Sequence, residues 1–228
     1  TPIDGEEDGD YGSAEHTTDP LCHGHDSSCP AESCQEILDH DLSATDGVYW
    51  INIHGGPTFE AYCDMSTDGG GWLLSLSYNH EGGTNPPLNA STLPISVDAG
   101  FSHTGTGAIE YPDIDEARFY CTTERHSRVI HFKTGNPHII EATNNPDTLP
   151  TWGPSDWSSG FTALDGHTGM LPAAASGTAD SSSLTEFPFY RTSEYHWGIR
   201  SWDRRWECDG NEFGSGYDFT TTHQVWVR

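Results

Sequence analysis

The sequence contains very little positive charge. Nine lysine and arginine residues stand against 35 aspartate and glutamate residues, which gives a formal net charge of −26 over 228 residues. Lys133 is the single lysine, and the other basic residues are arginines. A nucleic-acid duplex or an anionic lipid surface would repel such a chain. We therefore expect no nucleic-acid partner, and cations become the expected ligands.

Long apolar runs are missing as well. No stretch of about 18 apolar residues occurs, so we expect no transmembrane helix and no membrane insertion. The opening residues, Thr1-Pro2-Ile3-Asp4, resemble a processed N-terminus rather than a signal peptide. Hydrophobic residues make up only 33% of the chain, but 8 Trp, 9 Tyr and 9 Phe supply large areas for a core. The 25 glycines and 14 prolines indicate a loop-rich chain with short strands.

Familiar catalytic motifs are also absent. The chain has no Gly-x-Ser-x-Gly, His-Glu-x-x-His or P-loop pattern, so we do not expect an enzyme. It also lacks Cys-x-x-Cys, which argues against a zinc ribbon. An even number of cysteines, six, in an acidic and glycine-rich chain favours three disulfides in an oxidising compartment. The sequon Asn89-Ala90-Ser91 agrees with secretion and predicts glycosylation of Asn89.

Several segments have the composition of short strands. Two apolar runs joined by His54-Gly55-Gly56-Pro57 predict a hairpin. Residues 35–40 fit one or two helical turns, and long loops are expected over 79–107 and 143–186. The predicted strands cover residues 48–53, 58–63, 72–78, 118–121, 128–133 and 222–228.

The stretch from Cys34 to Trp72 resembles the start of a fibrinogen-related domain. That family opens with Cys-x-Glu-Ile, continues with a Gly-x-Tyr-x-Ile strand, and then has a Tyr-Cys-Asp-Met-x-Thr-x-Gly-Gly-Gly-Trp segment. The corresponding residues here are Cys34-Gln35-Glu36-Ile37, Gly47-Val48-Tyr49-Trp50-Ile51 and Tyr62-Cys63-Asp64-Met65-Ser66-Thr67-Asp68-Gly69-Gly70-Gly71-Trp72. The resemblance implies an α+β, fibrinogen C-terminal-like fold: a twisted, mostly antiparallel sheet with short helices, long loops and disulfides. It also implies a disulfide between Cys34 and Cys63.

The end of the chain is more loosely similar to intelectins, from Tyr195 to Arg200 and on through Cys208. These resemblances imply a non-enzymatic module used in recognition or in self-assembly. We predict an acidic N-terminal segment with a small cysteine loop (1–32), followed by a fibrinogen-related domain (33–228). The expected function is secreted, calcium-dependent, lectin-like glycan binding through residues 197–218. The alternative is a structural subunit of an extracellular matrix or filament.

Two groups of oxygen-bearing side chains could bind calcium. Around Asp4 the spacing matches a twelve-residue calcium loop with Gly9 at its sixth position, although a solvated acidic tail has the same composition. Its expected ligands are Asp4, Glu6, Asp8, Asp10 and Glu15. The second group lies between glycines and aromatic residues near the C-terminus, where a structural loop is the alternative. Its expected metal ligands are Asp203, Asp209, Asn211, Glu212 and Asp218, and its expected sugar contacts are Trp197, Trp202, Trp206 and Tyr217.

The segment Cys22-His23-Gly24-His25, together with Cys29, allows two interpretations. Two histidines and two cysteines could bind zinc, but in a secreted protein a Cys22–Cys29 disulfide is favoured. Cys121 and Cys208 would then be left to pair. Residues 1–20 lack the apolar area to order themselves, because fixing each backbone residue costs about 1–2 kcal/mol. We therefore expect calcium, or a second copy of the chain, to hold this segment in a homo-oligomer or filament. The alternative is that the segment packs on its own domain.

Overall fold

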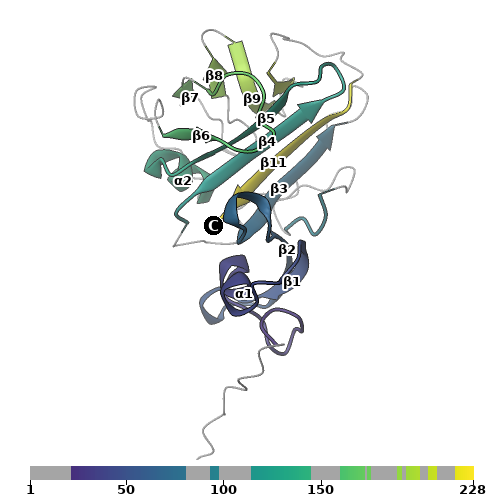
Figure 1. Ribbon diagram of the computed structural model, residues 1–228, viewed down its shortest axis with the longest axis vertical. Coiled ribbons are helices and arrows are strands. Elements are labelled where there is room, and N and C mark those ends of the chain that lie inside the picture. Colours follow the sequence, from purple (N-terminus) through teal and green to yellow (C-terminus); the bar gives the residue numbers. More distant parts are fainter. Residues whose placement is uncertain are drawn as a thin grey trace, which may run out of the picture.

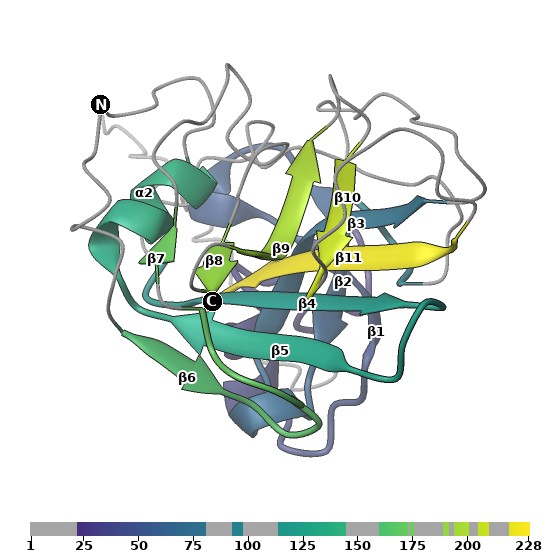
Figure 2. The same cartoon turned by 90° about the horizontal axis from the view of Figure 1, so that it is seen from above.

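Two antiparallel sheets and two short α-helices form the described part of the molecule (Figures 1 and 2). The computed structural model describes residues 22–80, 93–97, 114–144, 160–172, 174–175, 189–191, 194–200, 205–209 and 219–228. The larger sheet has seven strands in the order β1-β2-β3-β11-β4-β5-β6. They are β1 (Gly47–Ile51), β2 (Phe59–Asp64), β3 (Trp72–His80), β4 (Ala117–Thr123), β5 (Val129–Thr134), β6 (Phe161–Ala163) and β11 (Thr221–Val227).

The smaller sheet has four strands in the order β10-β9-β8-β7. They are β7 (Ala174–Ala175), β8 (Phe189–Arg191), β9 (Glu194–Arg200) and β10 (Arg205–Cys208). The helices are α1 (Cys34–His40) and α2 (Pro137–Asn144), and two 3-10 turns cover Ile53–Gly55 and Thr67–Gly69. None of the helices described in the structure combines the length and the apolar character that a membrane crossing requires.

This architecture confirms the predicted fold class, because the sheets are antiparallel, the helices are short and disulfides join the parts. All six predicted strands form, and so does the helix near residue 35. The sequence analysis missed α2 and the strands β6 to β10. The final strand, β11, does not lie at an edge but pairs with β3 on one side and β4 on the other (Figure 2).

The main core lies on one face of the larger sheet, which we call the apolar face. Cross-strand register places Leu76, Val225 and Phe119 in one row and Tyr78, His223 and Cys121 in the next. These side chains are fully buried. They pack against Trp197 of the smaller sheet and against Ile139 of α2. A disulfide between Cys121 of β4 and Cys208 of β10 joins the two sheets across this core.

A second cluster forms around α1 and the β1–β2 hairpin. Ser33 caps α1 by accepting a hydrogen bond from the Glu36 backbone N–H (3.0 Å), which satisfies one of the free donors at the helix start. The Cys34–Cys63 disulfide fixes the helix to β2 and confirms the pairing that the family resemblance implies. Cys34 and Ile37 are the buried residues of the helix, and they belong to this cluster.

Candidate functional site

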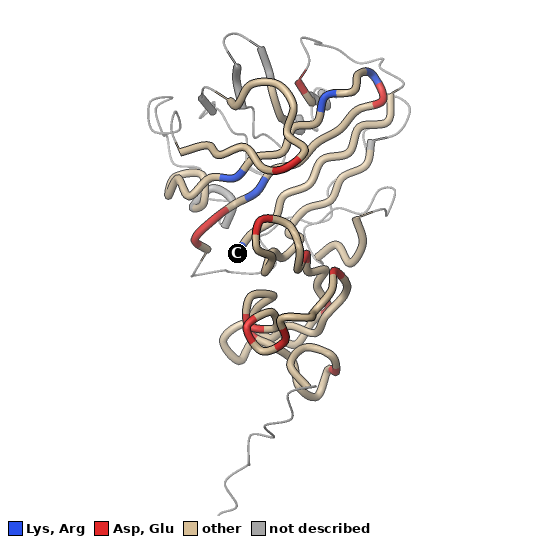
Figure 3. The backbone as a smooth tube through the Cα atoms, in the orientation of Figure 1, with Lys and Arg blue, Asp and Glu red and all other residues tan. Residues whose placement is uncertain are grey.

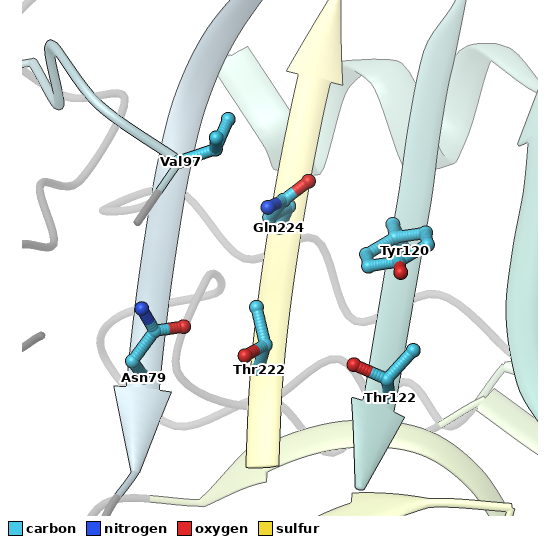
Figure 4. Close-up of a pocket in the computed structure, with 6 residues that line it drawn as sticks. All are labelled: Asn79, Val97, Tyr120, Thr122, Thr222 and Gln224. Atoms are coloured by element: carbon cyan, nitrogen blue, oxygen red, sulfur yellow. The ribbon is translucent and has the colours of Figure 1, made fainter. Parts of the chain in front are cut away.

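A polar groove lies on the opposite face of the larger sheet, where β3, β11 and β4 run side by side. We call this side the polar face. The groove has a volume of about 460 Å³, which is within the range of small-ligand pockets. Figure 4 shows the six lining side chains, which come from these three strands and from the segment 93–97. They are Asn79, Val97, Tyr120, Thr122, Thr222 and Gln224.

Strand register explains why these side chains meet. Asn79 is opposite Thr222, and Thr222 is opposite Thr122. Opposed residues in antiparallel strands project their side chains on the same face, within reach of one another. Gln224 and Tyr120 form the next row, two residues further along. The groove floor is therefore a small grid of hydroxyl and amide groups, built from segments that are far apart in the sequence.

The described lining residues of the groove carry hydrogen-bonding groups, and none of them is charged. The Gln224 amide oxygen accepts a hydrogen bond from Trp226 Nε1 (3.1 Å), and this bond orients the amide group. Tyr120 is half-buried, and its ring meets His131 edge-on at a centroid distance of 5.4 Å. Threonine hydroxyls both donate and accept hydrogen bonds. In a chain of net charge −26, this neutral surface suits an uncharged, hydroxyl-rich ligand better than an ion.

Further along the polar face, the few basic side chains form ion pairs with acidic ones. The Arg118 guanidinium is only 2% exposed and lies 2.7 Å from Asp64 Oδ2. It also faces the rings of Trp72 (4.9 Å) and Trp226 (4.3 Å). Burial raises the pKa of Asp64, but Arg118 and the Thr67 backbone N–H outweigh it and hold that pKa below its usual value. This cluster is a closed structural feature, because its charges are already paired.

Next to the Arg118–Asp64 pair, two basic and two acidic side chains form a second network of ion pairs. Lys133 contacts Asp68 (2.7 Å) and Glu116 (2.9 Å), and Arg228 contacts the same two carboxylates. Figure 3 shows how few basic residues the described chain has among its acidic ones. Because Lys133 and Arg228 are committed to these pairs, neither is an obvious receptor for an anionic ligand.

A buried histidine–aspartate pair joins β9 to the turn after β10. His196 is fully buried, and its Nδ1 donates a hydrogen bond to Asp209 Oδ1 (2.9 Å). The other Asp209 oxygen, Oδ2, is in contact with the Arg128 guanidinium. Burial raises the pKa of Asp209, but the contacts with His196 and Arg128 outweigh it and lower that pKa to about 2. The carboxylate is therefore ionised, and each of its oxygens contacts a basic side chain of the protein.

Two of the predicted site residues are placed by these observations. Trp197 is 0% exposed, its indole N–H donates to the Tyr120 carbonyl (3.0 Å), and its ring packs on Phe119. A ring in that position offers no face to a sugar, so the ligand-binding role predicted for Trp197 is corrected to a core role. Asp209, predicted as a calcium ligand, has both oxygens engaged by His196 and Arg128.

The other predicted residues are not placed. Trp206 belongs to β10, but its side chain is not described. The remaining predicted metal ligands, sugar contacts and sequon lie outside the described residues: Asp4, Glu6, Asp8, Asp10, Glu15, Asn89, Trp202, Asp203, Asn211, Glu212, Tyr217 and Asp218.

The alternatives for Cys22 and Cys29 are resolved by the structure. The two cysteines form a disulfide, so their sulfurs are not zinc ligands. Cys121 and Cys208 also pair, as expected for the two cysteines left over.

Sequence reasoning missed the groove, although one signal for it existed. Polar residues alternate with apolar ones in β3, as in Leu76-Ser77-Tyr78-Asn79, and such alternation marks a strand with one buried face.

Comparison with known proteins locates the likeness in part of the chain. No family model matches it. It is 50% identical over 44 residues to Veficolin-1 of Varanus komodoensis, a match covering 19% of this chain and 20% of that protein. It is 45% identical over 49 residues to Tenascin of Mus musculus, covering 21% of this chain and 2% of that protein. The chain thus matches a fifth or less of the length of these curated relatives.

Among solved structures, the fibrinogen-like globe domain of human ANGPTL2 is similar at a TM-score of 0.47 and 16% sequence identity. That likeness covers 87% of this chain and 99% of the other.

Proposed function

We propose that this chain, as a member of the fibrinogen-related domain family, is a secreted recognition protein that binds neutral glycans in the groove of the polar face. The family is non-enzymatic and includes recognition proteins, and its disulfide-rich domains are typical of secreted proteins. The organisation into an N-terminal segment (1–32) and a domain (33–228) remains our prediction.

The observation that carries the proposal is the chemistry of the groove. Amide and hydroxyl groups from β3, β11 and β4 can exchange hydrogen bonds with neighbouring sugar hydroxyls. The Tyr120 ring gives the same surface an aromatic edge against which the apolar side of a sugar can pack. The volume of about 460 Å³ accommodates one or two sugar units rather than a polymer backbone.

Calcium is common in fibrinogen-related domains, so its fit to this chain matters. Calcium takes six to eight oxygen ligands. Of the ligands expected near the C-terminus, Asp209 is the one that the structure describes, and both of its oxygens are in ion pairs. The described residues therefore do not form the predicted site. Calcium dependence through Asp203, Asn211, Glu212 and Asp218 stays a separate proposal.

A glycan array probed with the full chain tests the function. We expect binding to neutral glycans, and a loss of about three- to tenfold in affinity for Thr222→Val and for Gln224→Ala, because each removes one ligand hydrogen bond. Thr162→Val is the matched control, since Thr162 is an exposed strand residue of β6 outside the groove. Repeating the array with a calcium chelator tests the calcium proposal by itself.

Two results would overturn the groove as the glycan site. One is unchanged glycan affinity in both groove variants. The other is a wild-type chain that binds no glycan. If the second result came with concentration-dependent self-association, it would favour the matrix or filament subunit, whose predicted contacts lie in residues 1–30.

A further inference from the structure

The loop that precedes α1 is held tightly against that helix. The Cys22–Cys29 disulfide closes the loop, and the Gly24 carbonyl accepts a hydrogen bond from the Trp50 backbone N–H (2.7 Å). Gly24 has a φ of +77°, and a Cβ there would lie 2.8 Å from Ile37 Cδ1. Glycine is thus required for the loop to approach the helix this closely. His23 is consequently held beside α1 by the packing of the backbone next to it.

The helix presents two potential metal ligands toward that loop. Glu36 and His40 are four residues apart, so they lie on the same face of α1. Glu36 Oε1 is 4.0 Å from His40 Nε2. The second carboxylate oxygen, Oε2, accepts a hydrogen bond from the Glu32 backbone N–H (2.5 Å). This bond fixes the carboxylate and leaves Oε1 directed to the histidine.

His23 completes the group. Its ring stacks on that of His40, with centroids 3.8 Å apart and planes inclined by 6°. One ligand atom from each of His23, Glu36 and His40 lies within 4.8 Å of the other two. Ligand atoms around a tetrahedral zinc ion are about 3.3 Å apart. Parallel stacked rings direct their lone pairs side by side, so binding of one ion by both histidines requires the His40 ring to rotate out of the stack; His40 is exposed at the end of α1, where such a rotation meets little packing.

We propose that His23, Glu36 and His40 bind one divalent transition-metal ion of the zinc class. Two imidazole nitrogens and one carboxylate oxygen are a zinc donor set, whereas calcium and magnesium require oxygens. The chain has a net charge of −26, and Glu32 and Asp39 lie next to the site in sequence, so a bound dication is favoured electrostatically.

Three protein ligands leave further coordination positions open. An ion bound here retains water or accepts a donor from another molecule, as open three-ligand zinc sites do. The ion also joins the disulfide loop 22–29 to α1, so its binding stabilises this end of the molecule. Figure 1 shows α1 at the end of the molecule away from the smaller sheet, and none of the three ligands lines the groove.

Cobalt titration of the chelator-treated full chain tests the proposal. Co²⁺ substitutes for Zn²⁺, and its visible absorption intensifies when it leaves the hexaaqua state for a low-coordinate site. We expect one such site per chain, displaced by Zn²⁺ and not by excess Ca²⁺. His40→Gln and His23→Gln should each weaken binding at least tenfold, as should Glu36→Gln, which keeps an acceptor for the Glu32 N–H.

The matched control is His25→Gln. His25 lies in the same disulfide loop, but its ring meets Tyr49 at 5.3 Å and it does not belong to the triad. The Co²⁺ affinity of the His25→Gln variant should equal that of the wild type. Disulfide mapping of Cys34–Cys63 and circular dichroism verify that each variant is folded.

Three outcomes would overturn the site: a wild-type Co²⁺ spectrum that stays hexaaqua, equal affinity in the His40→Gln variant, or displacement by Ca²⁺, which would assign the ion to oxygen ligands elsewhere. Glycan binding should be unchanged in His40→Gln, so this proposal and the proposed function fail separately.

Discussion

The two faces of the larger sheet use the same strands for opposite purposes. On the apolar face, Leu76, Val225 and Phe119 form a buried row that packs on the smaller sheet. One residue further along two of those strands, Gln224 and Tyr120 point the other way and line a groove of neutral polar groups. Alternation along a strand, with a period of two, places core packing and the groove on opposite faces at neighbouring residues.

The comparison also shows how a chain with few cations uses them. The polar face is not exposed to solvent along its whole length. Arg118, on this face, is buried against the rings of Trp72 and Trp226 and is paired with Asp64. That part of the face is as closed as the core. Among the described residues of this face, those around Thr222 and Gln224 offer hydrogen-bonding groups in a groove, and we propose recognition there.

Adjacent substitutions in β4 test the separation most strongly. Phe119→Ala should cost about 4 kcal/mol of unfolding free energy, because Phe119 is fully buried against Phe132 (5.4 Å) and Trp197 (5.2 Å). Tyr120→Ala, one residue along, should cost about 1 kcal/mol and instead weaken glycan binding. Chemical denaturation and the glycan array measure the two effects. Equal losses of stability in both variants would contradict the division between faces.

Removing the partner of Arg118 should have the next largest effect. Asp64→Ala leaves a buried guanidinium without its carboxylate, and the expected loss is about 3 kcal/mol. Asp64→Asn should lose less, since its amide oxygen still accepts hydrogen bonds from the Ser66 and Thr67 backbone N–H groups. The double variant Asp64→Leu/Arg118→Met should recover most of the stability, because it leaves no buried charge. An Asp64→Ala protein with the wild-type denaturation midpoint would contradict a stabilising role for the pair.

Much of the fold could be predicted from the sequence because its signals are local. The motif from Cys34 to Trp72 indicated the family and the Cys34–Cys63 disulfide, and apolar runs located six strands. Three strands of the smaller sheet, β7, β8 and β10, were missed because they have only two to four residues, and β9 was missed although it has seven. The helix α2 was missed because Pro137-His138-Ile139-Ile140 gives little helical periodicity in sequence.

The candidate site was harder to predict for a topological reason. The groove exists because β11 lies between β3 and β4, and nothing in residues 221–227 states which strands they will join. Counting acidic and aromatic residues near the C-terminus gave the wrong role for Trp197, since composition does not distinguish a buried indole from an exposed one. The loop around His23 was recognised as a possible metal site, but the sequence did not show that Glu36 and His40 of α1 would lie beside it.

The pH dependence of stability should report on Asp209. Its pKa is lowered from 3.8 to about 2 in the folded protein, so the stability that it contributes is present above pH 3.8 and is lost as pH falls toward 2. Burial disfavours the charge, and His196 and Arg128 favour it more. The contribution is about 2 kcal/mol. The difference in unfolding free energy between wild type and Asp209→Asn should therefore shrink below pH 3.8; a constant difference down to the acid limit would contradict this account.

The smallest effect should come from two buried serines of β3. Ser75 is 1% exposed, and its Oγ donates to the Val225 carbonyl (3.0 Å) where the pairing of β11 with β3 is irregular. Ser77 is 0% exposed, and its Oγ has no hydrogen-bond partner among the described residues. A buried hydroxyl without a partner costs free energy, whereas one with a partner contributes it.

Alanine at the two positions should therefore have effects of opposite sign. Ser75→Ala loses a hydrogen bond and should destabilise the fold by about 1 kcal/mol, while Ser77→Ala removes an unsatisfied group and should be neutral or stabilising by less than about 1 kcal/mol. Because the substitution is the same and the strand is the same, helix or strand propensity and side-chain volume cancel in the comparison. Thermal and denaturant unfolding of both variants measure it. A Ser77→Ala variant as destabilised as Ser75→Ala would show that the Ser77 hydroxyl has a partner in solution, and would extend the hydrogen-bonding grid of the polar face beneath Gln224.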